Sequence, residues 1–248
     1  MKKLKEEFKN MLLNVGQDFP EEILTALFPI RGAKYKGELM VVGRAINGWG
    51  HDNDEISWKP EKGNPTAEII ENIIDYSFEE NGVCPMKWIT DHWGWETEEN
   101  LKTSEKDQYN MKKKAFWRVI KEILLELKIT TSETEKKNWS SYLVWSNLYK
   151  VASPEGGNPS TRLGDVQREG CRSVLKEEIS FFKPKRILFL TGYDWFEDFK
   201  DNSFEGKERT ESLVEWVGNY GKTEVIVAKH PQGKDETEYV KQVIKYFQ

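Results

Sequence analysis

The sequence predicts one α/β domain, a three-layer α/β/α sandwich around a central, mainly parallel sheet of about four strands. Short apolar runs, typical of strands that are buried on both faces, recur along the chain. Amphipathic runs with helical spacing lie between most of them. From residue 143 to residue 192 the order is strand, loop, helix and strand, which predicts a βαβ unit with parallel strands and a right-handed crossover.

The chain is expected to begin with a helical extension, residues 1–30, that packs on the main domain. Apolar residues between positions 4 and 12 share one helical face, and Pro20 is suited to start a second short helix. The first buried strand is predicted at 38–43, and a glycine-rich loop follows it at 44–50.

Helices are predicted at 64–78 and 110–127, where large apolar residues recur at helical spacing. The segment 81–104 is expected to be irregular, and core or lid packing is the simplest role for its three tryptophans, Trp88, Trp93 and Trp95. Phe116 and Trp117 on the second helix are expected to lie in the core.

The second half of the chain carries the clearest elements. The βαβ unit places strands at 143–145 and 187–190 on either side of a helix at 163–182. The elements predicted after it are a short aromatic helix at 193–199, a hairpin with strands at 212–217 and 223–228, and a final helix at 235–247.

Composition indicates a folded domain with a very polar surface. The 248 residues are 38% hydrophobic and 32% charged, and no repeat or linker divides them, so residues 1–248 are expected to form one domain. No apolar run approaches the roughly 20 residues that cross a bilayer, and the N-terminus lacks the pattern of a secretory signal. A cytoplasmic monomer is therefore expected. The net charge of −5 disfavours broad nonspecific binding to nucleic acid but permits a local basic rim around a cleft.

Metal and cofactor sites are not expected. The two cysteines, Cys84 and Cys171, exclude a disulfide framework and a four-cysteine iron–sulfur site built from this chain alone. The three histidines, His51, His92 and His230, lack the spacing of a structural zinc site.

Each predicted core strand ends in a loop of small or polar residues. These loops span 43–50, 147–153, 192–194 and 230–233. Because the carboxyl ends of parallel strands meet at one edge of a sheet, residues far apart in the sequence are expected to share one cleft there.

Several motifs follow one another in a characteristic order. They are Ser146-Asn147-Leu148-Tyr149-Lys150, a loop with prolines, Cys171-Arg172 with Leu175 and Ile179, Lys183-Pro184-Lys185 with Leu190 and Gly192, and His230-Pro231. Over about 90 residues their order and spacing resemble the uracil-DNA glycosylase superfamily, in particular its branch with the motifs N-x-x-K, C-R-x-x-L, K-P-K and H-P-S. The likeness extends more loosely from Glu38 to the C-terminus. The resemblance implies a base-excising α/β/α fold.

The resemblance also implies roles for two residues. Asn147 matches the asparagine whose amide reads the Watson–Crick edge of uracil, which offers an acceptor beside a donor. A simple loop cap is the alternative for this residue. His230 matches the histidine that stabilises the departing base anion, and removing such a donor typically costs a few kcal/mol of barrier. A surface histidine before a proline turn is its alternative.

The loop after the first strand departs from the family pattern. Related sequences read G-E-A-P-G or G-I-N-P-G, where the acid or asparagine positions the attacking water, and here the loop begins Gly43-Arg44-Ala45-Ile46-Asn47. In one register Arg44 replaces the acid. In the other Asn47 matches the asparagine, and Asn47 is the expected water-positioning residue. Asp52 and Asp54 fit a solvated acidic loop better than a catalytic role. Trp49 is a candidate for stacking on a flipped base, worth about 1–3 kcal/mol, or packs beneath its own loop.

Phosphate contacts are expected from the histidine loop and its neighbours. Gln232 replaces the usual serine of that loop, and Lys229, Lys234 and Lys150 are candidates for a basic rim. A solvated face is the alternative for these lysines. The expected partner is DNA, single-stranded or uracil-containing, with no membrane.

Three functions remain open at this point. The first is a DNA glycosylase-like hydrolase for a uracil-type base. The second keeps the fold without the chemistry, as a nucleic-acid-binding, nucleotide-binding or interaction protein, and Arg44 and the acidic net charge favour it. The third is an unrelated α/β small-molecule enzyme, which the absence of a phosphate-binding glycine fingerprint and of a nucleophile elbow disfavours.

Overall fold

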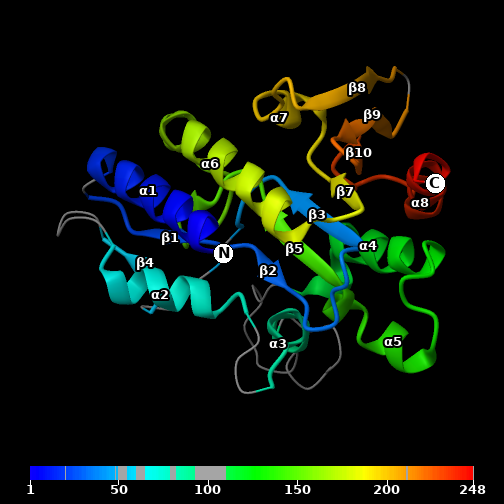
Figure 1. The fold of residues 1–248 in the computed structure, drawn as a ribbon, viewed down its shortest axis with the longest axis horizontal. Coiled ribbons are helices and arrows are strands. Elements are labelled where there is room, and N and C mark those ends of the chain that lie inside the picture. The colour runs from blue at the N-terminus through cyan, green and yellow to red at the C-terminus, as the bar shows by residue number, and fades with distance from the viewer. Residues whose placement is uncertain are drawn as a thin grey trace.

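The computed structural model of the chain describes residues 1–19, 21–47, 49, 55–59, 65–78, 82–92, 110–210 and 212–247. Within these residues, seven strands form a central mixed sheet in the order β2-β5-β3-β7-β10-β9-β8 (Figure 1). The α/β class predicted from the sequence is confirmed. None of the helices in the described part of the chain is long and apolar enough to cross a bilayer.

Four parallel strands form the centre of the sheet. They are β3 (Leu39–Gly43), β5 (Leu143–Asn147), β7 (Arg186–Phe189) and β10 (Thr223–Ala228). β3 pairs in parallel with β5 on one side and β7 on the other, and β10 pairs in parallel with β7. The four predicted core strands are therefore confirmed. Every residue of β3 and β5 is buried, as expected of strands covered on both faces.

Antiparallel strands extend the sheet beyond the predicted four. At one edge, β2 (Ile30–Arg31) pairs with β5. On the other side, β9 (Val214–Tyr220) pairs with β10, and β8 (Phe204–Glu208) pairs with β9 and forms the edge. The predicted hairpin is confirmed as β9–β10. Its turn contains only Gly221 and Lys222, because Tyr220 already pairs with Thr223. Gly221 adopts a φ of 58°, which two-residue hairpin turns require at their first position.

The N-terminal region is only partly helical. α1 (Lys2–Asp18) forms, but the expected second helix does not. Instead β1 (Leu24–Ala26) is fully buried and pairs antiparallel with β4 (Ser57–Trp58) and β6 (Val151–Ala152) in a separate three-stranded sheet. Tertiary pairing and burial of Leu24 and Ala26 override the helix-start signal. Pro20 lies outside the described residues.

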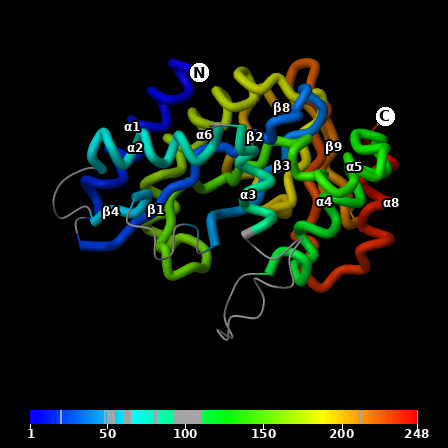
Figure 2. Tube along the Cα trace, turned by 90° about the horizontal axis from the view of Figure 1, so that it is seen from below, coloured from blue at the N-terminus to red at the C-terminus, as the bar shows by residue number. Residues whose placement is uncertain are grey.

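Helices pack in pairs around the sheet. α1 lies along α6 (Thr161–Phe182), where Gly170 leaves room for Met11, and α4 (Ala115–Glu126) lies beside α8 (Glu236–Tyr246). Figures 1 and 2 show β3 between the α1–α6 pair and the α4–α8 pair. Side-chain caps begin two predicted helices: Thr66 accepts from Ile69 N at the start of α2 (Ala67–Asp75), and Asp235 accepts from Glu238 N at the start of α8.

The remaining elements are short. They are α3 (Pro85–His92), the 3₁₀ turn η3 (Met111–Lys113), α5 (Glu133–Lys137), the 3₁₀ turn η4 (Trp139–Tyr142) and α7 (Tyr193–Glu197). α3 lies in the region expected to be irregular, so that expectation was wrong for residues 85–92. Trp88, for which core or lid packing was expected, is 39% exposed and so does not lie in the core. Trp93 and Trp95 lie outside the described residues.

Candidate functional site

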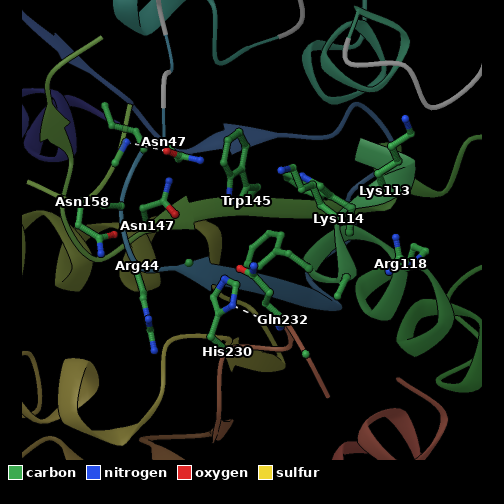
Figure 3. A pocket seen from close by; sticks show the side chains of 18 of the residues that line it. Arg44, Asn47, Lys113, Lys114, Arg118, Trp145, Asn147, Asn158, His230 and Gln232 are labelled. Atoms are coloured by element: carbon green, nitrogen blue, oxygen red, sulfur yellow. Dashed lines mark hydrogen bonds between the residues drawn. The ribbon is translucent and has the colours of Figure 1, made fainter. Parts of the chain in front are cut away.

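The carboxyl ends of the four parallel strands meet at one edge of the sheet, and a cavity of about 660 Å³ opens there (Figure 3). Gly43 at the end of β3 pairs directly with Asn147 at the end of β5. Five parts of the described chain line the cavity: 43–47 with Trp49, the strand residues Trp145 and Asn147, 157–158, 113–118, and residues 230, 232–234 and 236. A second cavity of about 460 Å³ lies between α2 and α3, and none of the predicted site residues lines it.

Six of the eight predicted site residues line the larger cavity: Asn47, Trp49, Asn147, His230, Gln232 and Lys234. The convergence of Asn47, Asn147 and His230, which are remote in sequence, is the outcome expected of a parallel sheet whose loops form one site. Lys150 and Lys229 are not among the described residues that line it.

Asn147 presents a buried amide to the cavity. The residue is 2% exposed, and its Nδ2 has no hydrogen-bond partner. Its Oδ1 lies so close to Gly43 that a Cβ built on Gly43 would overlap it. Glycine at position 43 therefore leaves the space that the Asn147 side chain occupies. Because a buried, unpaired amide costs about 1–3 kcal/mol, this group is suited to gain a partner when a ligand enters.

His230 is half-buried and stacks on the ring of Phe116, with centroids 6.3 Å apart and the planes 22° apart. The N–H of Gln232 donates to His230 Nδ1 over 3.4 Å, which leaves the proton of the neutral imidazole on Nε2. Burial lowers the pKa of His230, and the nearby charge of Arg44 lowers it further. The imidazole is therefore held neutral, with Nε2–H as a hydrogen-bond donor.

Phe116 was expected in the core, and that expectation was wrong. Its ring is only partly buried and lines the cavity, and its Cζ lies 3.4 Å from the position of a Cβ on Gly43. Trp117, its neighbour on α4, is 1% exposed and points toward the core while also touching the cavity wall. Because neighbouring residues of a helix point in different directions, the Phe116 ring faces the cavity and most of the Trp117 ring lies in the core.

Trp49 forms part of the wall instead of an open platform. It is 6% exposed, and its ring meets Trp145 edge to face at 6.1 Å. This is the packing alternative considered from the sequence. The aromatic ring that lies beside His230, and beside Gly43 where Asn147 packs, is that of Phe116.

Asn47 joins two loops at the cavity mouth. Its Oδ1 accepts the N–H of Gly157 over 2.7 Å, which ties the loop after β3 to the loop that follows β6. The side chain is exposed and lines the cavity, so its Nδ2 and the second lone pair of Oδ1 face a ligand or water. Asp52 and Asp54 lie outside the described residues.

Lys150 was predicted on the basic rim, and the structure contradicts this. Its side chain is 0% exposed and lies 2.6 Å from Glu178 Oε1. The chain turns inward after Asn147 to form β6, which carries the ammonium group into the interior. Lys229 is partly exposed but points to Glu215, with Nζ 3.8 Å from Oε1.

Of the predicted rim lysines, Lys234 lines the cavity, and four further cations join it. They are Arg44, Lys113, Lys114 and Arg118. Among the described residues that line the cavity, Glu236 is the one carboxylate, and Arg118 holds it with Nε 3.0 Å from Oε2 and Nη2 2.5 Å from Oε1. The mouth is thus positively charged on a chain whose net charge is −5. Three consecutive lysines, 112–114, were the signal that sequence reasoning passed over; they lie inside the helix predicted at 110–127 and directly before the observed α4.

Arg44, which one register of the sequence comparison places where related sequences carry an acid, makes its contacts away from the Asn147 amide. Its Nε donates to the Thr191 carbonyl oxygen over 2.6 Å, and its guanidinium lies 5.2 Å from the Trp195 ring centroid. Burial lowers its pKa, while the carboxylates of Asp194 and Glu215 act in the opposite direction. Arg44 therefore ties the β3 loop to the segment after β7 and contributes positive charge near His230.

Comparison with known proteins adds no family assignment: no protein-family model matches the chain, and no curated protein sequence matches it significantly.

Proposed function

We propose that the protein is a uracil-DNA glycosylase-like hydrolase, which accepts a flipped uracil-type base of DNA and hydrolyses its N-glycosidic bond. The observation that carries the proposal is the buried, unpartnered amide of Asn147, which lines one cavity with Phe116 and His230. A central parallel sheet with helices on both sides and loops gathered at its carboxyl edge is in keeping with the expected sandwich fold.

Recognition of the base follows from the amide. Uracil presents the O4 acceptor beside the N3–H donor, and one carboxamide in a fixed orientation complements both. Asn147 Nδ2 donates to O4 and Oδ1 accepts from N3–H in this arrangement. The Phe116 ring gives the base a face to stack on, worth about 1–3 kcal/mol.

Cleavage breaks the bond between the sugar C1′ and the base N1. The electron pair stays on the base, positive charge develops on the sugar, and water adds to C1′ and releases a proton. Nε2–H of His230 donates to the base oxygen where the negative charge accumulates. A neutral imidazole is suited to this role because it stabilises the anion by a preorganised hydrogen bond, which typically contributes a few kcal/mol.

A second candidate is a protein that binds a base in DNA without cleaving it. One observation favours it: among the described residues that line the cavity, the single carboxylate, Glu236, is engaged by Arg118. Asn47, the expected water-positioning residue, already accepts from Gly157. Water activation by a free carboxylate therefore has no support among these residues.

The decisive assay incubates the protein with single- and double-stranded oligonucleotides that contain uracil and scores abasic sites. Wild type is expected to form abasic sites, and Asn147→Ala and His230→Ala are each expected to lower the rate by 10²-fold or more. Asn219→Ala removes a similar amide from the exposed part of β9 and serves as the control. If the wild-type protein binds the strands but releases no base, the protein is a base-binding protein and not a hydrolase.

Asn47→Asp separates the two candidates further. The carboxylate keeps an acceptor for the Gly157 N–H and adds a base at the cavity mouth. A hydrolase limited by water activation should release uracil faster in this variant, by about 10²-fold. A protein that only binds the base should gain no release at all.

A further inference from the structure

Lys150 and Glu178 form an ion pair that is sealed from solvent immediately behind Asn147. Both side chains have 0% exposure, and Lys150 Nζ lies 2.6 Å from Glu178 Oε1. Lys150 belongs to the segment that leaves β5, and Glu178 belongs to the buried face of α6. Neither residue is among the described residues that line the cavity, so neither has a place in the reaction proposed above.

The ammonium group makes two hydrogen bonds beside the ion pair. Lys150 Nζ donates to Ser146 Oγ over 2.6 Å and to the carbonyl oxygen of Asn147 over 2.5 Å. The Ser146 hydroxyl in turn donates to Glu178 Oε2 over 2.9 Å. Two side chains of β5 and α6 and one main-chain oxygen thus surround the charge. That main-chain oxygen belongs to the residue whose amide faces the cavity.

The peptide groups that follow Asn147 are fixed as well. The N–H groups of Leu148 and Tyr149 donate to the carbonyl oxygens of Gly43 and Arg44, over 2.9 and 3.0 Å.

The next two N–H groups, those of Lys150 and Val151, both donate to Gln167 Oε1, over 3.0 and 2.9 Å. The main chain from 147 to 151 is therefore held on every side. Among the side-chain nitrogen and oxygen atoms of residues 147–151, only Nδ2 of Asn147 is buried without a hydrogen-bond partner.

Stability by itself is a poor reason for such a pair. Desolvation of two charges cancels most of their attraction, and apolar residues of similar volume often replace a buried ion pair with no loss of stability. A pair that instead fixes one particular peptide contributes conformational specificity. We propose that the Lys150–Glu178 pair is a positioning device for Asn147: it fixes the main-chain carbonyl of Asn147, and with it the point from which the amide reaches into the cavity.

The orientation matters because uracil and cytosine present opposite patterns. Uracil has an acceptor at O4 and a donor at N3, while cytosine has a donor at N4 and an acceptor at N3. A carboxamide turned over about its last bond would fit cytosine as well as the original orientation fits uracil. Preference for uracil therefore depends on where the amide lies and how it is turned, and the fixed main chain at Asn147 sets the position from which the amide meets the base. This inference rests on the proposed function only where it names the base.

The test compares wild type with the double variant Lys150→Met/Glu178→Met, which removes both charges and keeps similar volume. Ile179→Val, one residue further along α6, is the control for general loosening of the core. Binding is measured with oligodeoxyadenylates that carry one uracil or one cytosine. The side-chain amide signal of Asn147 is followed by ¹⁵N–¹H NMR, assigned through Asn147→Ala.

The double variant is expected to lose at least tenfold in the ratio of uracil to cytosine affinity and to shift or broaden the Asn147 amide signal. Ile179→Val should change neither. An unchanged ratio and an unchanged signal in the folded double variant would overturn the proposal. If the double variant does not fold, Ser146→Ala, which removes only the hydroxyl between the charges, should give smaller changes in the same direction, and no change would again overturn it.

The two proposals fail separately. A wild-type protein without any preference for uracil contradicts the proposed function, and the Asn147 amide signal then decides the positioning role alone. An unaltered signal in the variants contradicts that role even if wild type releases uracil.

Discussion

The Asn147 side chain occupies space that a glycine at position 43 leaves open, so two residues from adjacent strands determine one another. Gly43 has no positive φ, so its backbone conformation does not require glycine. Glycine is needed there because a Cβ would overlap the Asn147 side chain. The amide nitrogen gains no protein partner from this contact. The unpaired Nδ2 of Asn147 thus costs about 1–3 kcal/mol of stability, and a ligand that accepts its hydrogen bond would remove this cost.

Gly43→Ala is expected to displace Asn147 and abolish base recognition. Overpacking at this point should also lower the free energy of unfolding by about 1–3 kcal/mol, measured by urea denaturation. Gly170→Ala, which crowds Met11 at the α1–α6 contact, is the matched control because it overpacks a site remote from the cavity. Normal binding of uracil-containing strands by Gly43→Ala would contradict the assigned position of Asn147.

His230 should make the stability depend on pH. Its pKa lies below the ordinary value of 6.5 in the folded chain because burial and Arg44 disfavour the charged ring. The unfolded chain therefore binds the proton more readily, so stability is complete above pH 6.5 and falls as the pH drops below it. His230→Gln should flatten this fall, measured as the difference in unfolding free energy between pH 7.5 and pH 5.5. An equal fall in both proteins would show that His230 is not the group responsible.

At the scale of elements, two helices carry the charged side of the cavity. α4 begins directly after Lys113 and Lys114, and α8 begins two residues after Lys234. Arg118 on α4 and Glu236 on α8 join the two helix starts through three nitrogen–oxygen contacts of 2.5, 3.0 and 3.2 Å. The pair is about one-third exposed, so it contributes little stability and chiefly sets the charge of the mouth.

Glu236→Gln is expected to increase affinity for single-stranded DNA by a few-fold. The change removes the carboxylate that neutralises Arg118 and leaves the guanidinium to a phosphate. Fluorescence anisotropy at low salt measures the effect. Glu238→Gln, two residues along α8 and paired with Gln242 and Lys241, removes the same charge away from the cavity. Equal gains in both variants would point to net charge alone.

The sequence predicted the elements whose pattern is set by burial. β3, β5, β7 and β10 are apolar runs, and α6 shows a clear helical stripe. The pattern of apolar residues therefore predicted all five elements. The strands that were missed are two to five residues long, and β8, with the sequence Phe-Glu-Gly-Lys-Glu, carries charges along an exposed edge. Such strands exist because a neighbour offers hydrogen bonds, which no local pattern reveals.

The sequence also predicted part of the candidate site. Asn147 ends one core strand and His230 follows another, and the meeting of strand ends brought them together. Phe116 was missed because its place at the border of the apolar stripe of α4 gives no sign of which side it faces. Lys150 was wrongly placed, since spacing along the chain does not show whether a lysine after a strand turns outward or into a buried ion pair.

For the whole molecule, the uneven charge distribution decides how a nucleic acid would bind. The net charge is −5, while the described lining of the cavity holds five cations and one carboxylate. Distant phosphates are repelled by the chain as a whole, and phosphates near the mouth are attracted. Binding should therefore be local, with few phosphate contacts and a moderate dependence on salt.

Lys113→Gln/Lys234→Gln is expected to reduce the salt dependence of single-strand binding. Each phosphate contact contributes about 0.7 to the slope of log affinity against log salt, so the loss of two should lower the slope by about 1.4. Lys207→Gln/Lys222→Gln changes the net charge equally, from −5 to −7, at exposed positions of β8 and the β9–β10 turn. Affinity titrations between 50 and 200 mM salt compare the two proteins. If both pairs lower the slope alike, the cavity mouth is not where the strand binds; a fall confined to the first pair locates the phosphates beside Asn147 and His230.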